Sequence, residues 1–502
     1  MTHEPIGKPN IVLIMTDQQR ADFFASEGFP VDAMPRVEAL GRKGTRFSRA
    51  YTPMPTCTPA RTSMMTGRFP KATRVKQNWS PRDFVVYDRD LPQVLREAGY
   101  TVNLAGKNHS YLAPEDFDYF SGDYSHTNGP KDRASAEEVA FDQWLVDLDH
   151  TVAKEPTPFP VERELCARIV DDAMDCVDNN GEKPFFLWLS LPEPHNPYQA
   201  PEPYFSMFSP DDMPERVGSR ETTLARGGHW QWLAELFEEK RPGYDADWRR
   251  YRAVYAGMIR MLDDQIARFL DHLDEKGIAD DTLVIFVSDH GDFAGDHGLQ
   301  RKGVGLPECL VRVPMMIAGP GVKTQLNATD FVSLVDLFPT LCEMIGADIP
   351  AGVQGRSLWP MLTGGDYPAR EFESIYSELG IGDLPYDPGE TPELHFPYEG
   401  LTIDELNAVT QSGNRKMVRK GDFKLNFDVM GNASLHDLSK DPGELANLYD
   451  DPGHADVKAD MLATLLSWSI RTEDSLPRAR YVAKPAPHGW YWRDDKHEGT
   501  SR

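Results

Sequence analysis

Four short apolar runs, each followed by polar or charged side chains, constrain the fold of this 502-residue chain more than any other feature. They are Asn10–Asp17 (NIVLIMTD), Tyr100–Leu104, Pro184–Ser190 (PFFLWLS) and Thr282–Ser288 (TLVIFVS). A continuous apolar run of this length is typical of a strand that is buried on both faces of a parallel sheet. The segments Val161–Asp178 and Arg250–Glu275 are expected to be helices, the second with clear amphipathic spacing. We therefore expect an α/β fold.

Polar side chains stand just after these runs, at the carboxyl ends of strands, where open α/β sheets form their binding sites. They are Asp17 and Gln18 after the first run, Lys107 and His109 after the second, His195 after the third, and Asp289 and His290 after the fourth. Taken singly, each is as well explained as an ordinary loop or capping residue. The repetition at four strand ends favours a functional site.

A second constraint is the segment Pro53–Pro70 (PMPTCTPARTSMMTGRFP), which places Cys57 at a loop-to-helix junction. We expect Thr58 to cap the helix, with Pro59 in its first turn and Gly67 at its end. The free N–H groups of such a helix start make an anion site beside Cys57. Arg61 lies one turn on, on the same face. The spacing between this Cys and Arg is too short for the loop of a thiol phosphatase.

The run Cys57-Thr58-Pro59-Ala60-Arg61 resembles the C-x-P-x-R signature of the type I, formylglycine-dependent sulfatases. In that family the Cys is oxidised after translation to formylglycine, whose hydrated aldehyde is the nucleophile. Further matches follow in family order, among them Asp17-Gln18, Gly106-Lys107-Asn108-His109 and Asp289-His290-Gly291-Asp292. The resemblance implies an alkaline-phosphatase-like fold: a large mixed, mostly parallel sheet sandwiched by helices, with a smaller C-terminal α+β domain.

The resemblance also assigns roles to individual residues. The implied metal ligands are Asp17, Gln18, Cys57, Asp289 and His290. The implied catalytic and substrate-binding residues are Cys57, Arg61, Asn78, Lys107, His109, His195 and Lys302. Asn78 is implied to contact the substrate, as an Asn at about this place does in choline-sulfatase-like and phosphonate-monoester-hydrolase-like relatives. Lys107 and His109 match the sulfatase pattern and depart from the phosphonate monoester hydrolases, which carry uncharged residues there.

The implied cofactor is one divalent metal ion. Oxygen ligands favour Ca²⁺ and also suit Mg²⁺, whereas the imidazole of His290 keeps Mn²⁺ open. Formylglycine at position 57 implies a formylglycine-generating maturation enzyme as a partner. His195 and His109 are the two candidates for the general acid that the leaving group needs.

Composition limits the partners. The net charge of −26 argues against nucleic acid and anionic membranes, and it requires a local basic pocket to draw in an anionic substrate. The five cysteines are too few and too scattered for a disulfide framework or a zinc cluster. Because the N-terminal residues lack the shape of a signal peptide, we expect a cytoplasmic protein.

A shift in composition at Gly364–Arg370 predicts a boundary between a catalytic domain, residues 1–366, and a C-terminal small-sheet domain, residues 367–502. The second domain is expected to contain a hairpin around Lys420-Gly421-Asp422 and a closing helix, Asp456–Arg471. Its tail carries Trp490, Tyr491 and Trp492, which suggests docking on the core or on another subunit of a homo-oligomer. Two stretches without clear period, Leu112–Pro160 and Glu202–Trp248, are expected to shape the substrate pocket.

Three functions remain open at this point. The first is hydrolysis of a sulfate monoester, with a small anionic ester or a sulfated sugar as substrate. The second is hydrolysis of a phosphonate monoester or phosphodiester on the same scaffold. The third is a non-catalytic binding protein that keeps Cys57 unmodified. The metal residues Asp17-Gln18 and Asp289-His290 favour the second, as does Asn78, whereas Lys107 and His109 favour the first.

Overall fold

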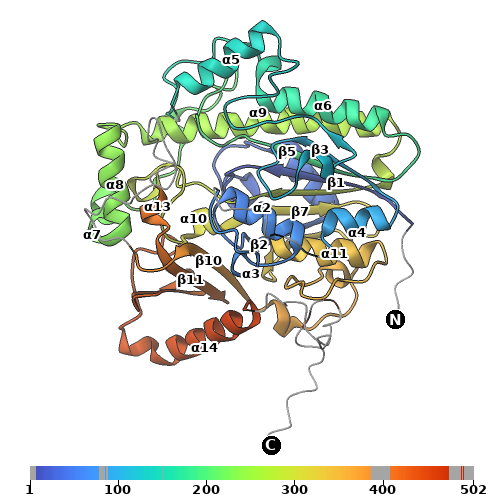
Figure 1. Ribbon diagram of the computed structural model, residues 1–502. Coiled ribbons are helices and arrows are strands. Elements are labelled where there is room, and N and C mark those ends of the chain that lie inside the picture. The colour runs from blue at the N-terminus through green and yellow to red at the C-terminus, as the bar shows by residue number, and fades with distance from the viewer. Residues whose placement is uncertain are drawn as a thin grey trace, which may run out of the picture.

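A computed structural model describes residues 7–78, 85, 87, 89–149, 151–385, 407–473, 488 and 490. Two sheets and the helices packed on them make up this part of the chain (Figure 1). None of its helices combines the length and the apolar character that a membrane span requires.

The larger sheet has nine strands and is almost entirely parallel. Its order is β4 (Tyr119–Phe120), β3 (Thr101–Gly106), β5 (Phe185–Leu191), β1 (Asn10–Thr16), β6 (Thr282–Ser288), β7 (Arg312–Ala318), β2 (Thr45–Tyr51) and β8 (Gln325–Ala328), with β9 (Val332–Ser333) also paired to β2. Only β7 runs against its neighbours β6 and β2. The expected mixed, mostly parallel sheet is therefore confirmed, and all four apolar runs are strands within it.

Helices cover both faces of this sheet. One layer contains α1 (Pro35–Lys43), α6 (Leu165–Asn179) and α9 (Trp248–Glu275); the other contains α2 (Cys57–Thr66), α4 (Leu91–Glu97) and α11 (Leu337–Met344). Side chains of β1 alternate between the two cores, with Val12 and Ile14 in the first and Leu13 in the second. Burial on both faces explains why the strand sequences are continuously apolar.

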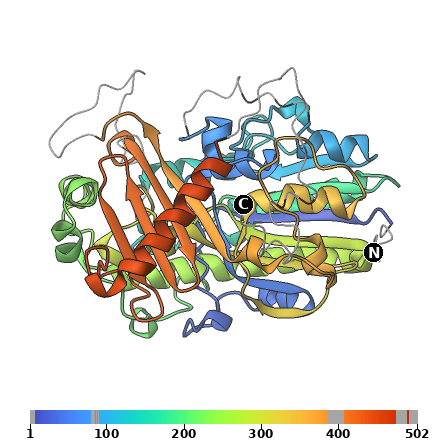
Figure 2. The ribbon, with the colours of Figure 1, turned by 90° about the horizontal axis from the view of Figure 1, so that it is seen from below.

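The smaller sheet is antiparallel and lies beside the larger one (Figures 1 and 2). Its order is β10 (Ser374–Gly382), β11 (Gly413–Lys420), β12 (Phe423–Asp428) and β13 (Ala433–Asp437), and α14 (Ala455–Arg471) packs across it (Figure 2). Glu308, next to the large sheet, lies 2.6 Å from Arg419 and 3.0 Å from Lys424 of the small one. The expected hairpin and closing helix are present, while the domain division after residue 366 stays a prediction.

The remaining α-helices of the described residues are α3 (Pro70–Thr73), α5 (Ala136–Asp147), α7 (Arg220–Ala225), α8 (Gly228–Lys240), α10 (Glu308–Val311), α12 (Trp359–Thr363) and α13 (Asn407–Thr410). Two of the longer ones, α5 and α8, lie in stretches expected to be irregular. In α5 the apolar residues do not share one face, because Phe141 and Leu145 are buried whereas Val139 and Val146 are about half exposed. A helix without a single apolar stripe gives no clear period in the sequence.

The aromatic tail is only partly described. Trp490 is buried against Phe372, and its indole N–H donates to the carbonyl of Ser357 at 3.2 Å, so this part of the tail docks on the core of its own chain. Tyr491 and Trp492 lie outside the described residues.

Candidate active site

Cys57 is the first residue of α2, and every residue of this helix is buried. The preceding residue, Thr56, is extended (φ −151°, ψ 132°), and its carbonyl accepts from the N–H of Ala60 at 3.0 Å. The prediction that Thr58 caps the helix is therefore wrong: the chain enters the helix before Cys57. Gly67 ends the helix as expected, with φ 63°, and a Cβ there would lie 2.9 Å from the side chains of Phe338 and Val353.

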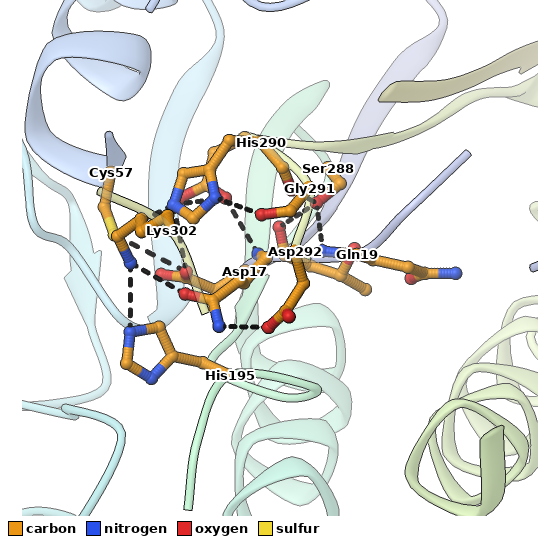
Figure 3. Close-up of polar contacts among 12 residues, drawn as sticks. Asp17, Gln19, Cys57, His195, Ser288, His290, Gly291, Asp292 and Lys302 are labelled. Carbon is orange, nitrogen blue, oxygen red and sulfur yellow. Dashed lines mark hydrogen bonds and ion pairs between the residues drawn. The ribbon is translucent and has the colours of Figure 1, made fainter. Parts of the chain in front are cut away.

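Four ligating groups converge at this helix start. Asp17 and Asp289 follow β1 and β6, two neighbouring parallel strands whose last paired residues are Thr16 and Ser288. One atom each from Asp17, Cys57, Asp289 and His290 lies within 4.8 Å of the others, and all four residues are fully buried. The Cys57 Sγ is 3.5 Å from Asp17 Oδ1 and 3.3 Å from His290 Nε2. Figure 3 shows Asp17, Cys57 and His290 in this arrangement.

The chemistry of this donor set fits one divalent cation. Carboxylate oxygens and an imidazole nitrogen are ligands that divalent cations take in proteins, and here they converge within 4.8 Å of one another. The Nδ1 of His290 is 2.9 Å from the carbonyl of Gly291, which can only accept, so Nδ1 carries the proton and Nε2 presents its lone pair to the group. Burial lowers the pKa of His290, which keeps the ring neutral, as a ligand must be.

Arg61 and Lys107 hold the outer oxygens of the two carboxylates. The guanidinium donates from Nε to Asp289 Oδ2 at 2.9 Å and from one terminal nitrogen to Asp17 Oδ2 at 3.2 Å. Lys107 Nζ donates to the same Asp17 oxygen at 2.7 Å. Because the Oδ2 atoms are engaged in this way, the Oδ1 atom of Asp17 is left to face Cys57 and that of Asp289 to face His290. Sequence reasoning expected Arg61 over Cys57; the structure places its guanidinium between the two carboxylates.

These charges set the protonation of the group. Burial alone would raise the pKa of Asp17, but the surrounding positive charges, that of Lys107 foremost, outweigh it and hold the pKa well below 3.8. Burial, reinforced by the Asp17 carboxylate, raises the pKa of the Cys57 thiol to about 11. An unmodified thiol at this position is therefore protonated, and a poor nucleophile, at neutral pH.

Lys302 and His195 lie on another side of Cys57 (Figure 3). Lys302 Nζ donates to Gln18 Oε1 at 2.7 Å and lies 3.3 Å from His195 Nε2. The Nδ1 of His195 is 2.7 Å from the Asn196 carbonyl, so Nδ1 carries the proton and Nε2 accepts from the lysine. Burial, followed by the charge of Lys302, holds the pKa of His195 well below 6.5.

The remaining predicted residues are placed less centrally. Asn78 Oδ1 accepts from the N–H of Thr58 at 3.1 Å, so it satisfies one free donor at the start of α2. His109 follows β3 in a left-handed conformation (φ 42°) and is half-buried, and its role stays a prediction. The roles that the resemblance implies for the other site residues likewise stay predictions.

Sequence reasoning missed two residues that contact the site. His126, from the stretch 112–160, packs against His195 with ring centroids 4.4 Å apart and the rings tilted by 33°. Asp292, in the Asp289-His290-Gly291-Asp292 block, accepts a hydrogen bond from the side-chain amide of Gln18. The block itself was the signal for Asp292, whereas nothing in the sequence around His126 distinguishes it from other polar loop residues.

Comparison with known proteins agrees with this geometry. Residues 9–347 match the sulfatase family profile. PehA, a multifunctional alkaline phosphatase superfamily protein of Trinickia caryophylli, is 28% identical over 93% of this chain and 96% of its own. An arylsulfatase of Clostridium perfringens is 29% identical over 88% of this chain and 90% of its own. The crystal structure of the phosphonate monoester hydrolase of Agrobacterium radiobacter is 26% identical, with a TM-score of 0.73 over 92% of this chain and 96% of that one.

Fold, relatives and the cluster around Cys57 together define a hydrolase of the alkaline-phosphatase-like superfamily. The family profile covers well over half of the sequence, and the chain belongs to the sulfatase family. The resemblance drawn from the motif around Cys57 is thereby confirmed. Its relatives support hydrolysis of sulfate or phosphonate esters as the general activity.

Proposed function

We propose that this protein hydrolyses sulfate monoesters, with formylglycine at position 57 as the nucleophile and one divalent cation beside it. The observation that carries the proposal is the convergence on Cys57: Asp17 and His290 face its sulfur at 3.5 and 3.3 Å. Lys107 and Lys302 add positive charge next to the same group, and both are nearly fully buried. A sulfate ester is an anion, so a buried pocket with these cations suits it within an otherwise acidic protein.

The proposed cation ligands are Asp17, Asp289, His290 and side chain 57, with Gln18 as a fifth. The amide oxygen of Gln18 accepts from Lys302 Nζ at 2.7 Å and has a second lone pair for the cation. When bound, a divalent cation at this position neutralises charge on the substrate and lowers the pKa of the attacking hydroxyl. Ca²⁺ is the proposed ion because carboxylate and amide oxygens predominate, with Mg²⁺ or Mn²⁺ as alternatives.

Conversion of Cys57 by a formylglycine-generating enzyme is part of the proposal. Formylglycine supplies a hydrated aldehyde, in which one hydroxyl is the nucleophile and the other allows the sulfate group to be released again. The raised pKa of the Cys57 thiol supports this requirement, because the unmodified side chain is uncharged at neutral pH.

The chain's own residues would bind the ester and supply the proton. Lys107 and Lys302 bind the sulfate oxygens, while Arg61 keeps the carboxylates oriented. The leaving oxygen needs a proton. Because His195 Nε2 accepts from Lys302 Nζ, we propose that these two residues share the proton that reaches the leaving group. His109 is the second candidate for this role. The proposed substrates are small sulfate esters or sulfated sugars.

Hydrolysis of phosphonate monoesters or phosphodiesters is the second candidate function. The phosphonate monoester hydrolase and PehA resemble this chain over nearly its whole length. Asn78 and the residue pairs Asp17-Gln18 and Asp289-His290 also suit this activity.

One experiment separates the candidates: kcat/KM for an aryl sulfate and for an aryl phosphonate monoester, measured on protein whose residue 57 is shown by peptide mass to be converted. The proposal expects faster hydrolysis of the sulfate. Faster hydrolysis of the phosphonate would support the second candidate. Turnover of neither ester by converted protein would favour a non-catalytic binding protein. The Cys57→Ala variant controls for contaminating activity.

A further inference from the structure

The side-chain amide of Gln18 lies between two groups of opposite and fixed hydrogen-bonding character. Its Nε2 is 2.5 Å from Asp292 Oδ2, and its Oε1 is 2.7 Å from Lys302 Nζ. A carboxylate only accepts and an ammonium only donates, so the amide can face only one way. Its oxygen must point toward Lys302 and its NH₂ group toward Asp292.

The backbone of Gln18 is held as firmly as its side chain. Its φ of 69° is left-handed, which is uncommon for a residue with a Cβ. The N–H donates to Asp289 Oδ1 at 3.1 Å, and the carbonyl accepts from Tyr255 at 2.6 Å. Gln18 therefore links the carboxylate of Asp289 to Lys302 through a conformation that its surroundings impose.

Asp292 is itself fixed by five donors in a fully buried position. Its Oδ1 accepts from the N–H groups of Ala294 at 2.6 Å and Arg301 at 3.1 Å, and from the hydroxyl of Tyr251. Its Oδ2 accepts from Tyr198 at 2.7 Å and from Gln18. Two of these donors are backbone groups, so an acceptor is obligatory at the Oδ1 position whatever residue stands there.

We propose that Asp292 is a positioning residue: by fixing the amide of Gln18, it holds the ammonium group of Lys302 beside side chain 57. The inference rests on the proposed function, because it assigns Lys302 to the binding of the substrate anion. Asp292 does not touch the substrate, and its effect passes through Gln18.

An isosteric substitution tests the polarity of this arrangement. In Asp292→Asn, the backbone donors keep the new amide oxygen at the Oδ1 position, so the NH₂ group faces Gln18 Nε2. Two donors then oppose each other. If Gln18 turns over to relieve this contact, its own NH₂ group faces Lys302, which is again donor against donor. In both cases the side chain of Gln18 no longer holds the ammonium group of Lys302 beside side chain 57.

A second substitution should restore it. In the double variant Gln18→Glu with Asp292→Asn, one oxygen of the new carboxylate accepts from the new amide at position 292 and the other from Lys302. The total charge of the site is unchanged, because the negative charge has moved from position 292 to position 18. Gln18→Glu alone places two carboxylates against each other, so we expect it not to restore kcat/KM.

The measurements are kcat/KM and KM for the better of the two aryl esters, together with the affinity for inorganic sulfate by calorimetry. We expect Asp292→Asn to lower kcat/KM about 100-fold, the size of effect that misplacement of a charged group produces. The double variant should return to within about tenfold of the wild type, as expected for a strongly coupled pair. Sulfate affinity should follow the same order.

Asp296→Asn is the matched control, because Asp296 is a buried carboxylate of the same loop whose partners are Arg20 and Arg252. Gln18→Glu should not rescue it. Equal losses in Asp292→Asn and the double variant, or full activity in Asp292→Asn, would overturn the proposal. If the wild type hydrolyses neither ester, the proposed function fails, while the sulfate affinities still decide whether Asp292 positions Lys302.

Discussion

The Nε2 atom of His290 lies 3.3 Å from the Sγ atom of Cys57, although 233 residues separate them in the chain. The end of β6 and the start of α2 bring them together. The first prediction concerns this contact: Cys57→Ala removes the side chain that formylglycine formation requires. We expect kcat/KM for the aryl sulfate to fall on the order of a thousand-fold or more, as in enzymes that lose their nucleophile.

Cys309→Ala is the control for this variant, because Cys309 is a partly buried cysteine outside the cluster around Cys57. It should keep the activity of the wild type. An active Cys57→Ala variant would show that residue 57 is not the nucleophile.

The second prediction concerns the cation. Protein stripped with a chelator should melt at a lower temperature, and Ca²⁺ should restore the melting temperature, because binding to the folded state alone stabilises it. The expected gain is about 2.7 kcal/mol at a cation concentration 100 times Kd. Asp289→Asn should abolish the response, whereas substitution of the exposed Asp280 should not. A response that survives in Asp289→Asn would place the cation elsewhere.

The third prediction concerns the preference between esters. Lys107 donates to Asp17 at 2.7 Å and is proposed to bind the sulfate group. Lys107→Ala should lower kcat/KM for the aryl sulfate by about 100-fold, and that for the phosphonate by clearly less. Lys183→Ala, at an exposed site, is the control. Equal losses for the two esters would mean that Lys107 does not discriminate between them.

The fourth prediction concerns pH and the contact between the two sheets. Glu308 is surrounded by Lys424 and Arg419, and although burial opposes them, these charges lower its pKa from 4.5 to about 2. The folded state therefore binds this proton less well than the unfolded state. The resulting stabilisation is present above pH 4.5 and is lost as the pH falls toward 2.

Glu308→Gln should accordingly lower the free energy of unfolding by about 3 kcal/mol at pH 7, the usual result of breaking a buried ion pair. The difference from the wild type should shrink below pH 4.5. Urea denaturation at pH 7 and pH 3 measures it, with the exposed Glu239→Gln as a control. A difference that does not change with pH would exclude Glu308 as its source.

The strands and most of the site could be predicted from the sequence because they depend on local patterns. A strand buried on both faces is apolar throughout, and parallel strands gather their carboxyl ends at one edge, so Asp17 and Asp289 were expected together. The start of α2 was misplaced by the assumption that a Thr side chain caps it. The carbonyl of Thr56 begins that helix instead, and this depends on backbone conformation rather than on residue type.

The partners of the site residues could not be predicted, because they are set by packing between distant segments. The contact of the His126 ring with the His195 ring joins a loop to a strand end. The contact between Asp292 and Gln18 depends on a left-handed backbone at Gln18, which no residue preference predicts. Likewise, Arg61 was expected near Cys57, yet its hydrogen bonds to the two carboxylates appear only in three dimensions.

The most direct test of the account is the rate of aryl sulfate hydrolysis as a function of the fraction of molecules in which residue 57 is formylglycine, determined by peptide mass. The account predicts a rate proportional to that fraction, with none at zero conversion. A rate that is independent of conversion would contradict it.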